Sequence, residues 1–470
     1  MGQHEPMAAR ALVRIGVALL LTAACLGAPL PASAQSSPKV AQQYEIVATL
    51  DLAAARLDAM ETLTLINRGA GALEHIDLSV IPRALGYLDM GEPITVDGVE
   101  ASTAWTTTTN LRIELPEPLE PRAAAAVVIQ FGLTVGTSAS PYTARLSHEN
   151  GVFSFGQWFP ILSPEHDVHG IGDSQISFTA DRIGLDLTTT TDLPRDAVAC
   201  PGLVVAPEEF GTRWTCEADD VRDFSFAVNP DYRLTSRTVG ETTLRVYTET
   251  VSGEVTAEKA AAALAGLNDA FGKYPWPDLV IAEIGGGGGF SMEYPRAIHL
   301  TRTKVTDTYV IFHEVAHQWF YAQLGNDQML EPWLDEGFAD FSARYLMGIG
   351  ENHCSTRAVD SSVFAWDAGP ISGGDWTSCD GYFHAVFYRG TELINAVRDA
   401  MGADEFFATM REFIERYRHD LVTGSALLDH LQRRSDVDLQ PLYRAYLTSY
   451  EPSAPDAGRR PRGGGSWRPF

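Results

Sequence analysis

The segment Val310–Phe320 constrains this chain most, because it places two histidines one helical turn apart within an apolar, aromatic-rich run. Positions i and i+4 share one face of an α-helix, so the imidazoles of His313 and His317 can reach a single ion. Neutral imidazole is a good ligand for Zn²⁺. Glu314 projects beside that face, where it can take a proton from a water molecule. The apolar flanks predict a buried helix, whereas a chance H-E-x-x-H would lie on an exposed one.

Glu336 supplies a third ligand for the same ion. Eighteen residues separate it from His317, enough for one helix to end near Gly325 and a second to return the carboxylate. Two histidines and a glutamate with an open fourth position form the catalytic arrangement of zinc. The sequence thus predicts one catalytic zinc ion per chain. Asp340 shares a helical face with Glu336, and is expected either to accept the second ring N–H of a histidine ligand or to be a solvated surface aspartate.

The rest of the chain changes from strand-like to helix-like sequence patterns about half-way along. Residues 44–234 show partial alternation of apolar and polar residues, with Thr, Val and Ile enriched, which predicts an antiparallel sheet domain. Several helical segments follow, among them one with Pro332 in its first turn and Gly348 at its end. The predicted fold class is α+β in two domains, with a β domain over 35–235 and a mainly α-helical zinc domain over 236–452.

Both ends of the chain are expected to lie outside these domains. Residues 1–34 have two arginines, the apolar run "IGVALLLTAACL" and a small-residue cleavage site before Gln35, the features of a secretory signal. They predict a periplasmic or secreted protein after cleavage, the alternative being a lipoprotein modified at Cys25. The segment 453–470 is rich in Pro, Gly and Arg and is predicted to be disordered.

Charge and cysteines limit the partners and the compartment. The net charge of −26 argues against nucleic acid or anionic lipid as a partner, and no segment after the signal is apolar for long enough to span a membrane. Four cysteines remain after signal removal, an even number that suits an oxidising compartment. The expected disulfides are local, Cys200 with Cys216 and Cys354 with Cys379. The alternatives are that some of these cysteines are free thiols or form a metal site, and no C-x-x-C spacing supports a metal site.

Two motifs together resemble those of the gluzincin metallopeptidases of the aminopeptidase N family. One is H-E-x-x-H, eighteen residues and the glutamate of "DEGFA"; the other is "GGGGGFSMEYP", similar to that family's exopeptidase signature G-x-M-E-N. Met292 and Glu293 match the signature, although a phenylalanine and a serine precede them. The resemblance runs from Gln157 to about residue 417. It implies a saddle-like N-terminal β domain followed by a thermolysin-like catalytic domain.

Glu293 decides which function is expected. A fixed carboxylate in the cleft would hold the cationic amino terminus of a peptide one residue from the metal, so that residues are removed one at a time. The expected function is therefore an exported zinc aminopeptidase acting on peptides. If Glu293 does not face the metal, a zinc endopeptidase of the same fold is the alternative. A catalytically weak zinc-containing binding protein is the third possibility.

One position departs from the family pattern. The family places a tyrosine, which stabilises the oxyanion, three residues before the glycine of Y-x-K-G, and this chain has Phe387 there. Losing an oxyanion donor costs on the order of 10²- to 10³-fold in rate. We expect a native tyrosine, Tyr382 or Tyr388, to take over this role. If neither does, the reading as a weak binding protein gains support.

Overall fold

The first half of the described chain consists of strands in which buried and exposed residues alternate. In β1 (Val40–Asp51), Tyr44, Ile46, Ala48 and Leu50 are buried and the residues between them are exposed. This period of two is that of a pleated strand with one face against a core. The β-strand structure predicted for this half of the chain is confirmed.

The computed structural model describes residues 40–137, 141–164, 176–286, 291–328, 330–350 and 384–447. Several predictions fall outside these ranges: the signal, the C-terminal tail, the pairing of Cys354 with Cys379, and the position of Tyr382. The disulfide between Cys200 and Cys216 is present, as predicted.

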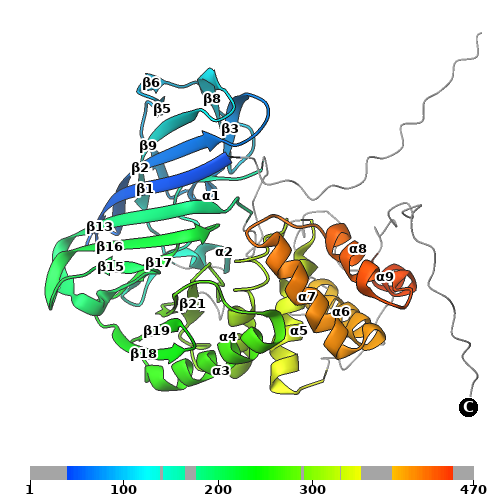
Figure 1. Ribbon diagram of the computed structural model, residues 1–470. Coiled ribbons are helices and arrows are strands. Elements are labelled where there is room, and N and C mark those ends of the chain that lie inside the picture. Colours follow the sequence, from blue (N-terminus) through cyan, green and yellow to red (C-terminus); the bar gives the residue numbers. More distant parts are fainter. Residues whose placement is uncertain are drawn as a thin grey trace, which may run out of the picture. The chain divides into compact units, whose positions relative to one another are not determined.

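The strands of the first half form one nine-stranded and two four-stranded sheets within the described residues (Figure 1). In chain order the elements after β1 are β2 (Arg56–Asn67), β3 (Leu73–Ser79), α1 (Ile81–Ala84), β4 (Leu88–Met90), β5 (Thr95–Val96), β6 (Val99–Glu100), β7 (Thr103–Trp105), β8 (Asn110–Leu119), β9 (Ala124–Thr134), α2 (Pro141–Ala144), β10 (Leu146–Glu149), β11 (Val152–Phe155), β12 (Ile161–Leu162), β13 (Ala180–Pro194), η1 (Arg195–Ala197), β14 (Val198–Ala199), β15 (Leu203–Val205), β16 (Phe210–Val221) and β17 (Phe226–Val228).

The large sheet has the order β15-β16-β13-β1-β2-β9-β5-β6, with β4 also paired to β9. The smaller sheets are β10-β11-β17-β14 and β12-β3-β8-β7. One pair differs from the antiparallel expectation, because β1 and β13 run parallel. Parallel neighbours need a long connection, and here most of the first half of the chain lies between the two strands. The alternation of apolar and polar residues along a strand shows which side chains lie on each face, but it does not show whether the neighbouring strand runs parallel or antiparallel.

The second half places a small mixed sheet beside a group of helices. Its elements are β18 (Arg233–Val239), β19 (Thr242–Thr248), α3 (Gly253–Phe271), β20 (Asp278–Ile284), β21 (Ala297–Thr301), α4 (Thr308–Ala316), η2 (Pro332–Leu334), α5 (Glu336–Met347), η3 (His384–Tyr388), α6 (Arg389–Met401), α7 (Ala403–Tyr417), α8 (Gly424–Arg434) and α9 (Gln440–Tyr446). The sheet order is β18-β19-β20-β21. Helix α3 packs on β18 and β19 and also contacts α4 and α5.

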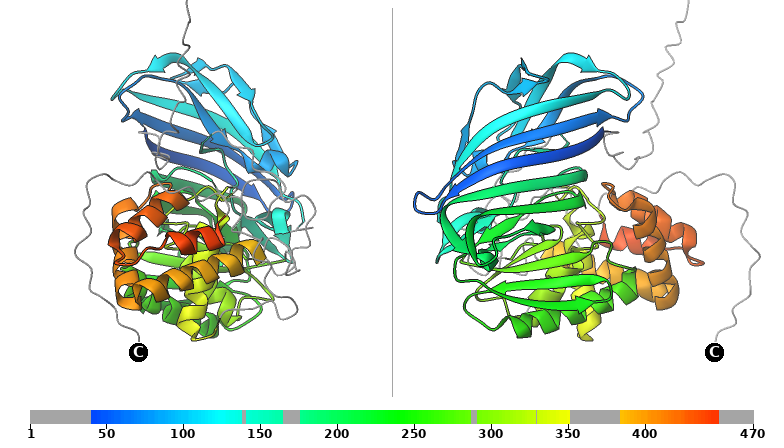
Figure 2. Two further views of the ribbon diagram at one scale, coloured as in Figure 1. Left: turned by 90° about the vertical axis from the view of Figure 1, so that its right-hand side faces the viewer. Right: turned by 60° about the vertical axis from the view of Figure 1, so that its left-hand side comes forward.

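The remaining helices gather beside α5, where Figures 1 and 2 show α6 to α9 together. Helix α6 contacts α5, α7 and α9, and α7 contacts α8. The small sheet adjoins the first half through β20, which contacts β11 and β14. A strand-rich region followed by a mainly helical one is the α+β order that the sequence predicted. The boundary at 235/236 stays a prediction, since Ser33–Phe470 behaves as one compact unit.

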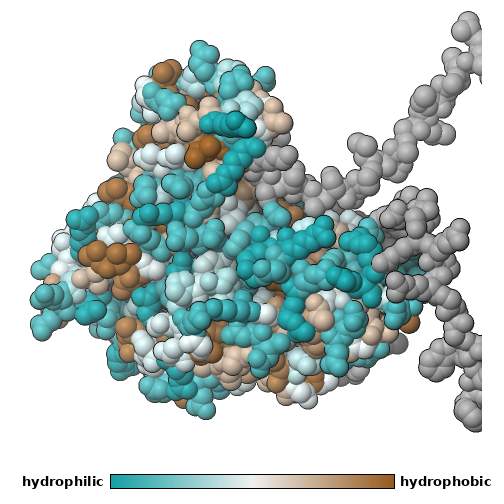
Figure 3. Space-filling model, viewed as in Figure 1, coloured by the Kyte–Doolittle hydropathy of each residue, from teal (hydrophilic) through white to brown (hydrophobic). Residues whose placement is uncertain are grey.

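The surface in Figure 3 is mostly hydrophilic, with a hydrophobic patch over β15 and β16. The exposed apolar side chains there are Val204, Val205 and Phe210. Strand β15 is an edge strand of the large sheet, so the patch marks a sheet edge. Among the described residues, no helix combines the length and apolar character needed to cross a bilayer.

Glu61 interrupts the buried row of β2. It is fully buried and lies opposite Ile46 of β1 and Ile129 of β9. Neither of its carboxylate oxygens has a hydrogen-bond partner among the described residues. Burial raises the pKa of Glu61 well above its ordinary value of 4.5. The folded core therefore tolerates the uncharged carboxyl group far better than the carboxylate.

Glu61 should make the folding stability of the chain fall as the pH rises. Because its pKa is raised in the folded state, its contribution is complete below the unfolded-state pKa and is lost as the pH rises towards the folded-state pKa. The expected slope is about 1.4 kcal/mol per pH unit. Glu61→Met should remove this slope and stabilise the protein at pH 8 by on the order of a few kcal/mol in urea unfolding. The exposed Glu45→Met should stay within about 0.5 kcal/mol; the same slope in wild type and Glu61→Met would contradict the prediction.

Candidate functional site

Helix α4 carries the H-E-x-x-H motif and ends at one of its histidines. The Asp307 side chain begins the helix by accepting hydrogen bonds from the backbone N–H groups of Tyr309 and Val310, a common N-cap arrangement. His313, Glu314 and His317 are all buried. The prediction of a buried helix, as opposed to a chance motif on the surface, is therefore confirmed.

The helix is shorter than the sequence predicted. It ends at Ala316, with His317 as its C-cap, and not near Gly325. Beyond it, Tyr321 has a φ of 130°, a value that side-chain-bearing residues rarely adopt and that no helix allows. The chain instead forms tight turns up to Gly325, which bridges to Leu421.

Helix α5 then returns the third ligand. The 3₁₀ turn Pro332–Leu334 precedes it, the helix begins at Glu336, and it ends with Gly348 in the left-handed conformation. Gly348 thus ends the helix as predicted, whereas Pro332 lies in the 3₁₀ turn that precedes the helix and not in its first turn. Helices α4 and α5 pack against each other. Glu336 lies at the helix N-terminus, where the helix dipole favours a carboxylate.

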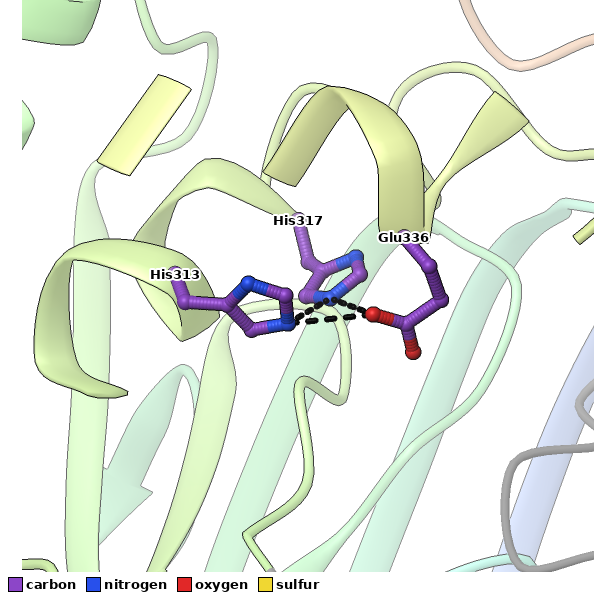
Figure 4. Close-up of side chains that lie close together, drawn as sticks. All are labelled: His313, His317 and Glu336. Atoms are coloured by element: carbon purple, nitrogen blue, oxygen red, sulfur yellow. Dashed lines mark hydrogen bonds and ion pairs between the residues drawn. The ribbon is translucent and has the colours of Figure 1, made fainter. Parts of the chain in front are cut away.

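The three predicted ligands point at one another (Figure 4). His313 Nε2 lies 3.0 Å from Glu336 Oε2 and 3.1 Å from His317 Nε2. His317 Nε2 lies 3.5 Å from Glu336 Oε2. Ligand atoms about 2.0–2.1 Å from a tetrahedral zinc ion lie roughly 3.3 Å apart. Both the identity and the spacing of these donor atoms therefore fit zinc.

The charge around this point also favours a cation. Glu293, Glu314 and His317 form a second group whose ligand atoms lie within 4.8 Å of one another. Burial and the neighbouring carboxylates raise the pKa of Glu314. Burial alone would lower the pKa of His317, but Glu336 and Glu293 outweigh it and raise that pKa well above its usual value. Three buried carboxylates around two imidazoles are an environment suited to a divalent cation.

The orientation of His317 is fixed by the main chain. Its Nδ1 lies 3.0 Å from the carbonyl oxygen of Phe320, so the N–H of that nitrogen donates there and Nε2 is left for the metal. His313 Nδ1 has no hydrogen-bond partner in the described part of the chain. The His313 ring is instead stacked against Tyr309 and Phe387, with centroids 6.0 and 5.6 Å away.

The role predicted for Asp340 is wrong in both of its forms. Asp340 is fully buried, so it is not a solvated aspartate, and its carboxylate accepts hydrogen bonds from Tyr309 Oη, Arg344 Nε and Thr391 Oγ1 instead of from a histidine. Helical spacing places Asp340 one turn from Glu336, as the structure shows, but does not reveal which way its carboxylate turns. Asp340 therefore affects the site indirectly, because it holds Tyr309, whose ring stacks on His313.

Glu293, the predicted amine anchor, lies close to the candidate metal ligands. It is buried, and its carboxylate is within 4.8 Å of ligand atoms of Glu314 and His317. Burial raises the pKa of Glu293 to about 7, while His317 and Arg145 oppose this increase. Arg145 comes from the first half of the chain, is fully buried, and donates a hydrogen bond to Gln157 Oε1. Arg145 could not be predicted from the sequence, because a lone arginine carries no pattern of its own.

Phe387 lies against the metal site because two glycines let the backbones of α5 and α6 touch. A Cβ atom on Gly337 would be 3.0 Å from the Cα of Gly390, and one on Gly390 would be 2.9 Å from the Cα of Gly337. The π-helical turn η3 ends directly before α6. It turns the Phe387 ring towards His313 at an interplanar angle of 13°, whereas the Tyr388 ring lies over Arg344, 6.0 Å from its Cζ.

The Phe387 ring stacks on His313 and the Tyr388 ring lies over Arg344, which argues against the expectation that Tyr388 takes over the oxyanion role. If Tyr382, which lies outside the described residues, does not take it over either, Phe387→Tyr should raise turnover by up to about 10²-fold, because it adds a hydrogen-bond donor beside a candidate metal ligand. Steady-state kinetics on a chromogenic peptide substrate would measure the gain. Tyr388→Phe is the matched control and should change turnover less than twofold, since that ring faces Arg344. Unchanged turnover in Phe387→Tyr would contradict the prediction and point to Tyr382 as the donor.

Comparison with known families agrees with this geometry. Residues 292–446 match the family described as the peptidase family M1 domain. The match covers about a third of the chain. The matched segment begins at Met292 and includes His313, Glu314, His317 and Glu336, so the resemblance to aminopeptidase N-like gluzincins is confirmed.

A curated relative is aminopeptidase M1-A of Oryza sativa subsp. japonica, 23% identical over 238 residues. The match covers 44% of this chain and 27% of the rice protein, so the chain spans about a quarter of that relative's length.

The fold is that of solved M1 zinc metallopeptidases. The structure of the enzyme from Deinococcus radiodurans is 18% identical, has a TM-score of 0.65, and covers 91% of this chain and 98% of its own. A mutant of the same protein, described with a Tyr-Ser-Ala substrate, has a TM-score of 0.64 at 18% identity and the same coverage. A two-domain M1 mutant bound to L-arginine also has a TM-score of 0.64. The predicted α+β fold is confirmed, and zinc is the metal that this fold family and the donor set share.

Proposed function

We propose that this protein is an exported zinc aminopeptidase that removes residues one at a time from the amino terminus of peptides. The observation that carries the proposal is the position of Glu293. Its buried carboxylate lies within 4.8 Å of ligand atoms of Glu314 and His317, beside the predicted metal ligands. A metallopeptidase that cleaves internal bonds has no need of an extra buried carboxylate there.

Glu293 is suited to bind an ammonium group. A carboxylate and an ammonium group form charge-assisted hydrogen bonds, which gain strength where water is excluded. Arg145 and His317 favour the ionised form of Glu293 that such binding requires. An amino terminus held at Glu293 places the first peptide bond of the substrate near the metal ligands. Longer chains on the amino side would meet the buried carboxylate and be excluded.

The chain's own residues then supply the proton transfers. When bound, zinc would polarise the scissile carbonyl group and acidify a water molecule. Glu314, buried next to His317, would accept a proton from that water and deliver it to the leaving amine. His313, His317 and Glu336 would hold the metal. Phe387 offers no hydroxyl group to the developing oxyanion, so Phe387 should limit the rate.

Two other readings make different predictions. A zinc endopeptidase of the same fold would cleave amino-blocked peptides as well as free ones. A catalytically weak zinc-containing binding protein is favoured by one observation, the phenylalanine that faces His313 where the family has a tyrosine. The proposal predicts measurable hydrolysis with a strong preference for a free amino terminus.

Glu293→Gln tests the proposal directly. It keeps the size of the side chain and removes the charge, so kcat/KM for an aminoacyl p-nitroanilide should fall by about 10²-fold, chiefly through KM, while zinc content stays at one per chain. The N-acetylated substrate, which lacks the cation, should be a poor substrate for both proteins. Glu331→Gln, a largely buried carboxylate that accepts from the N–H of Gly424, serves as the control. An equal preference for free and acetylated substrates in wild type would favour the endopeptidase.

Export is part of the proposal. It is supported by the signal-like residues 1–34 and by the Cys200–Cys216 disulfide, a bond typical of oxidising compartments. Amino-terminal sequencing of the exported protein should find Gln35 as the first residue. Recovery of the full-length chain from the cytoplasm alone would contradict export.

A further inference from the structure

Gln318 connects the metal-binding helix to the segment that carries Glu293. It directly follows the ligand His317 and is fully buried. Its Nε2 donates to the carbonyl oxygens of Glu293 and Tyr294, each at 3.2 Å. Its Oε1 accepts from the backbone N–H of Arg296 at 2.8 Å. One side chain thus bonds to three backbone groups of a four-residue turn.

The partners of Gln318 fix the orientation of its amide. Two of them are carbonyl oxygens, which only accept, and the third is an N–H group, which only donates. The NH₂ group must therefore face Glu293 and Tyr294, and the oxygen must face Arg296. No other side chain of this size offers two donors and one acceptor in that arrangement. Glutamate lacks the donors, and methionine has neither donors nor a strong acceptor.

The turn is anchored on its other sides as well. Met292 and His299 exchange two backbone hydrogen bonds, and the Arg296 side chain binds Asp278 of β20. Arg296 itself adopts a left-handed conformation, with a φ of 61°. These contacts hold the turn to the small sheet. Gln318, which directly follows the H-E-x-x-H motif, hydrogen-bonds to this turn.

We infer that Gln318 is a positioning residue that sets the distance between the amine anchor and the metal, and thereby which peptide bond is cleaved. The inference rests on the proposed function, because it takes Glu293 to bind the substrate's amino group. His317 and Gln318 are adjacent, so the metal ligand and the turn of Glu293 cannot shift independently while the three hydrogen bonds hold. A displacement of about 1 Å can cost on the order of 10²-fold in rate.

Gln318→Met tests this inference, because it keeps the length of the side chain and removes all three hydrogen bonds. The measurement is kcat/KM for an aminoacyl p-nitroanilide divided by kcat/KM for its N-acetyl derivative. This ratio should fall at least 10-fold, with KM for the free substrate raised and zinc content unchanged. Gln318→Glu, which puts an oxygen against two carbonyl oxygens, should lower the ratio at least as much.

Gln323→Met is the matched control. Gln323 is also fully buried and donates to the carbonyl oxygen of Gln318, but it makes no hydrogen bond to the turn of Glu293. It should keep the wild-type ratio within about twofold, although it also removes a buried hydrogen bond. If the ratio falls by a similar factor in Gln323→Met and Gln318→Met, the loss of any buried hydrogen bond in this segment has the same effect. That result would overturn the inference.

Glu293→Gln, run in parallel, separates the inference from the proposed function. If Glu293→Gln lowers the ratio and folded, zinc-loaded Gln318→Met does not, the inference fails and the function stands. If neither variant lowers it, both fail. Hydrogen exchange of the wild type provides a second test that does not depend on whether the variants fold. The Arg296 amide, bonded to Gln318, should exchange far more slowly than an exposed turn amide; rapid exchange would refute the inference.

Discussion

Glu314→Gln should abolish nearly all hydrolysis while leaving the zinc in place. The substitution keeps the volume of the side chain but removes its ability to accept a proton, and a positioned general base is worth about 10²- to 10⁴-fold in rate. Glu314 is not one of the three residues, His313, His317 and Glu336, proposed to hold the metal, so metal binding should survive. The loss should appear in kcat, with a much smaller change in KM.

Metal analysis and kinetics on the same preparation check both parts of this prediction. Zinc at one ion per chain, together with kcat reduced at least 10²-fold, is the expected pair of results. Glu331→Gln, a largely buried carboxylate bonded to the Gly424 N–H, should retain wild-type kcat. Retained turnover in Glu314→Gln would show that another group accepts the proton.

His317→Ala should remove the metal itself. It deletes one of three ligands, and the loss of affinity should exceed the 10- to 100-fold that is typical when only an outer-shell partner of a ligand is lost. Activity should vanish with the metal. It should not return on adding zinc at concentrations that reload a chelator-stripped wild type. Dialysis against a zinc buffer followed by elemental analysis measures the change in affinity.

His430→Ala is the control for this variant. His430 is buried on α8 next to Phe413 and lies outside the candidate metal group. It should bind zinc as the wild type does. Undiminished zinc in His317→Ala would disprove the ligand assignment, since the geometry offers no reason for two ligands to suffice.

The close approach of the candidate metal ligands could be predicted because helical spacing is a local property. Residues four apart on a helix share a face whatever the rest of the fold does, and His313 and His317 meet as expected. Glu336 followed from the requirement of zinc for a third ligand. In the same way, alternating burial along β1 could be predicted from its own residues.

The parts that were wrong or missed depend on tertiary structure. Nothing local to β1 shows that β13 runs parallel to it. The early end of α4 at Ala316 goes with the backbone conformation of Tyr321, which its own side chain disfavours. Asp340 turns towards Tyr309 and Arg344, which only the packing of α4 against α5 brings within reach. Hydrogen bonds from one side chain to a distant turn, as at Gln318, leave no periodic pattern in a sequence.

The proposed function is the removal of single residues from a free amino terminus. Its most direct test is a digest of an unblocked ten-residue peptide by the zinc-loaded wild type, followed over time by mass spectrometry. We expect a ladder of products that each lack one more amino-terminal residue, and an intact peptide when the amino terminus is acetylated. Internal fragments from both peptides, or no cleavage of either at zinc saturation, would contradict it.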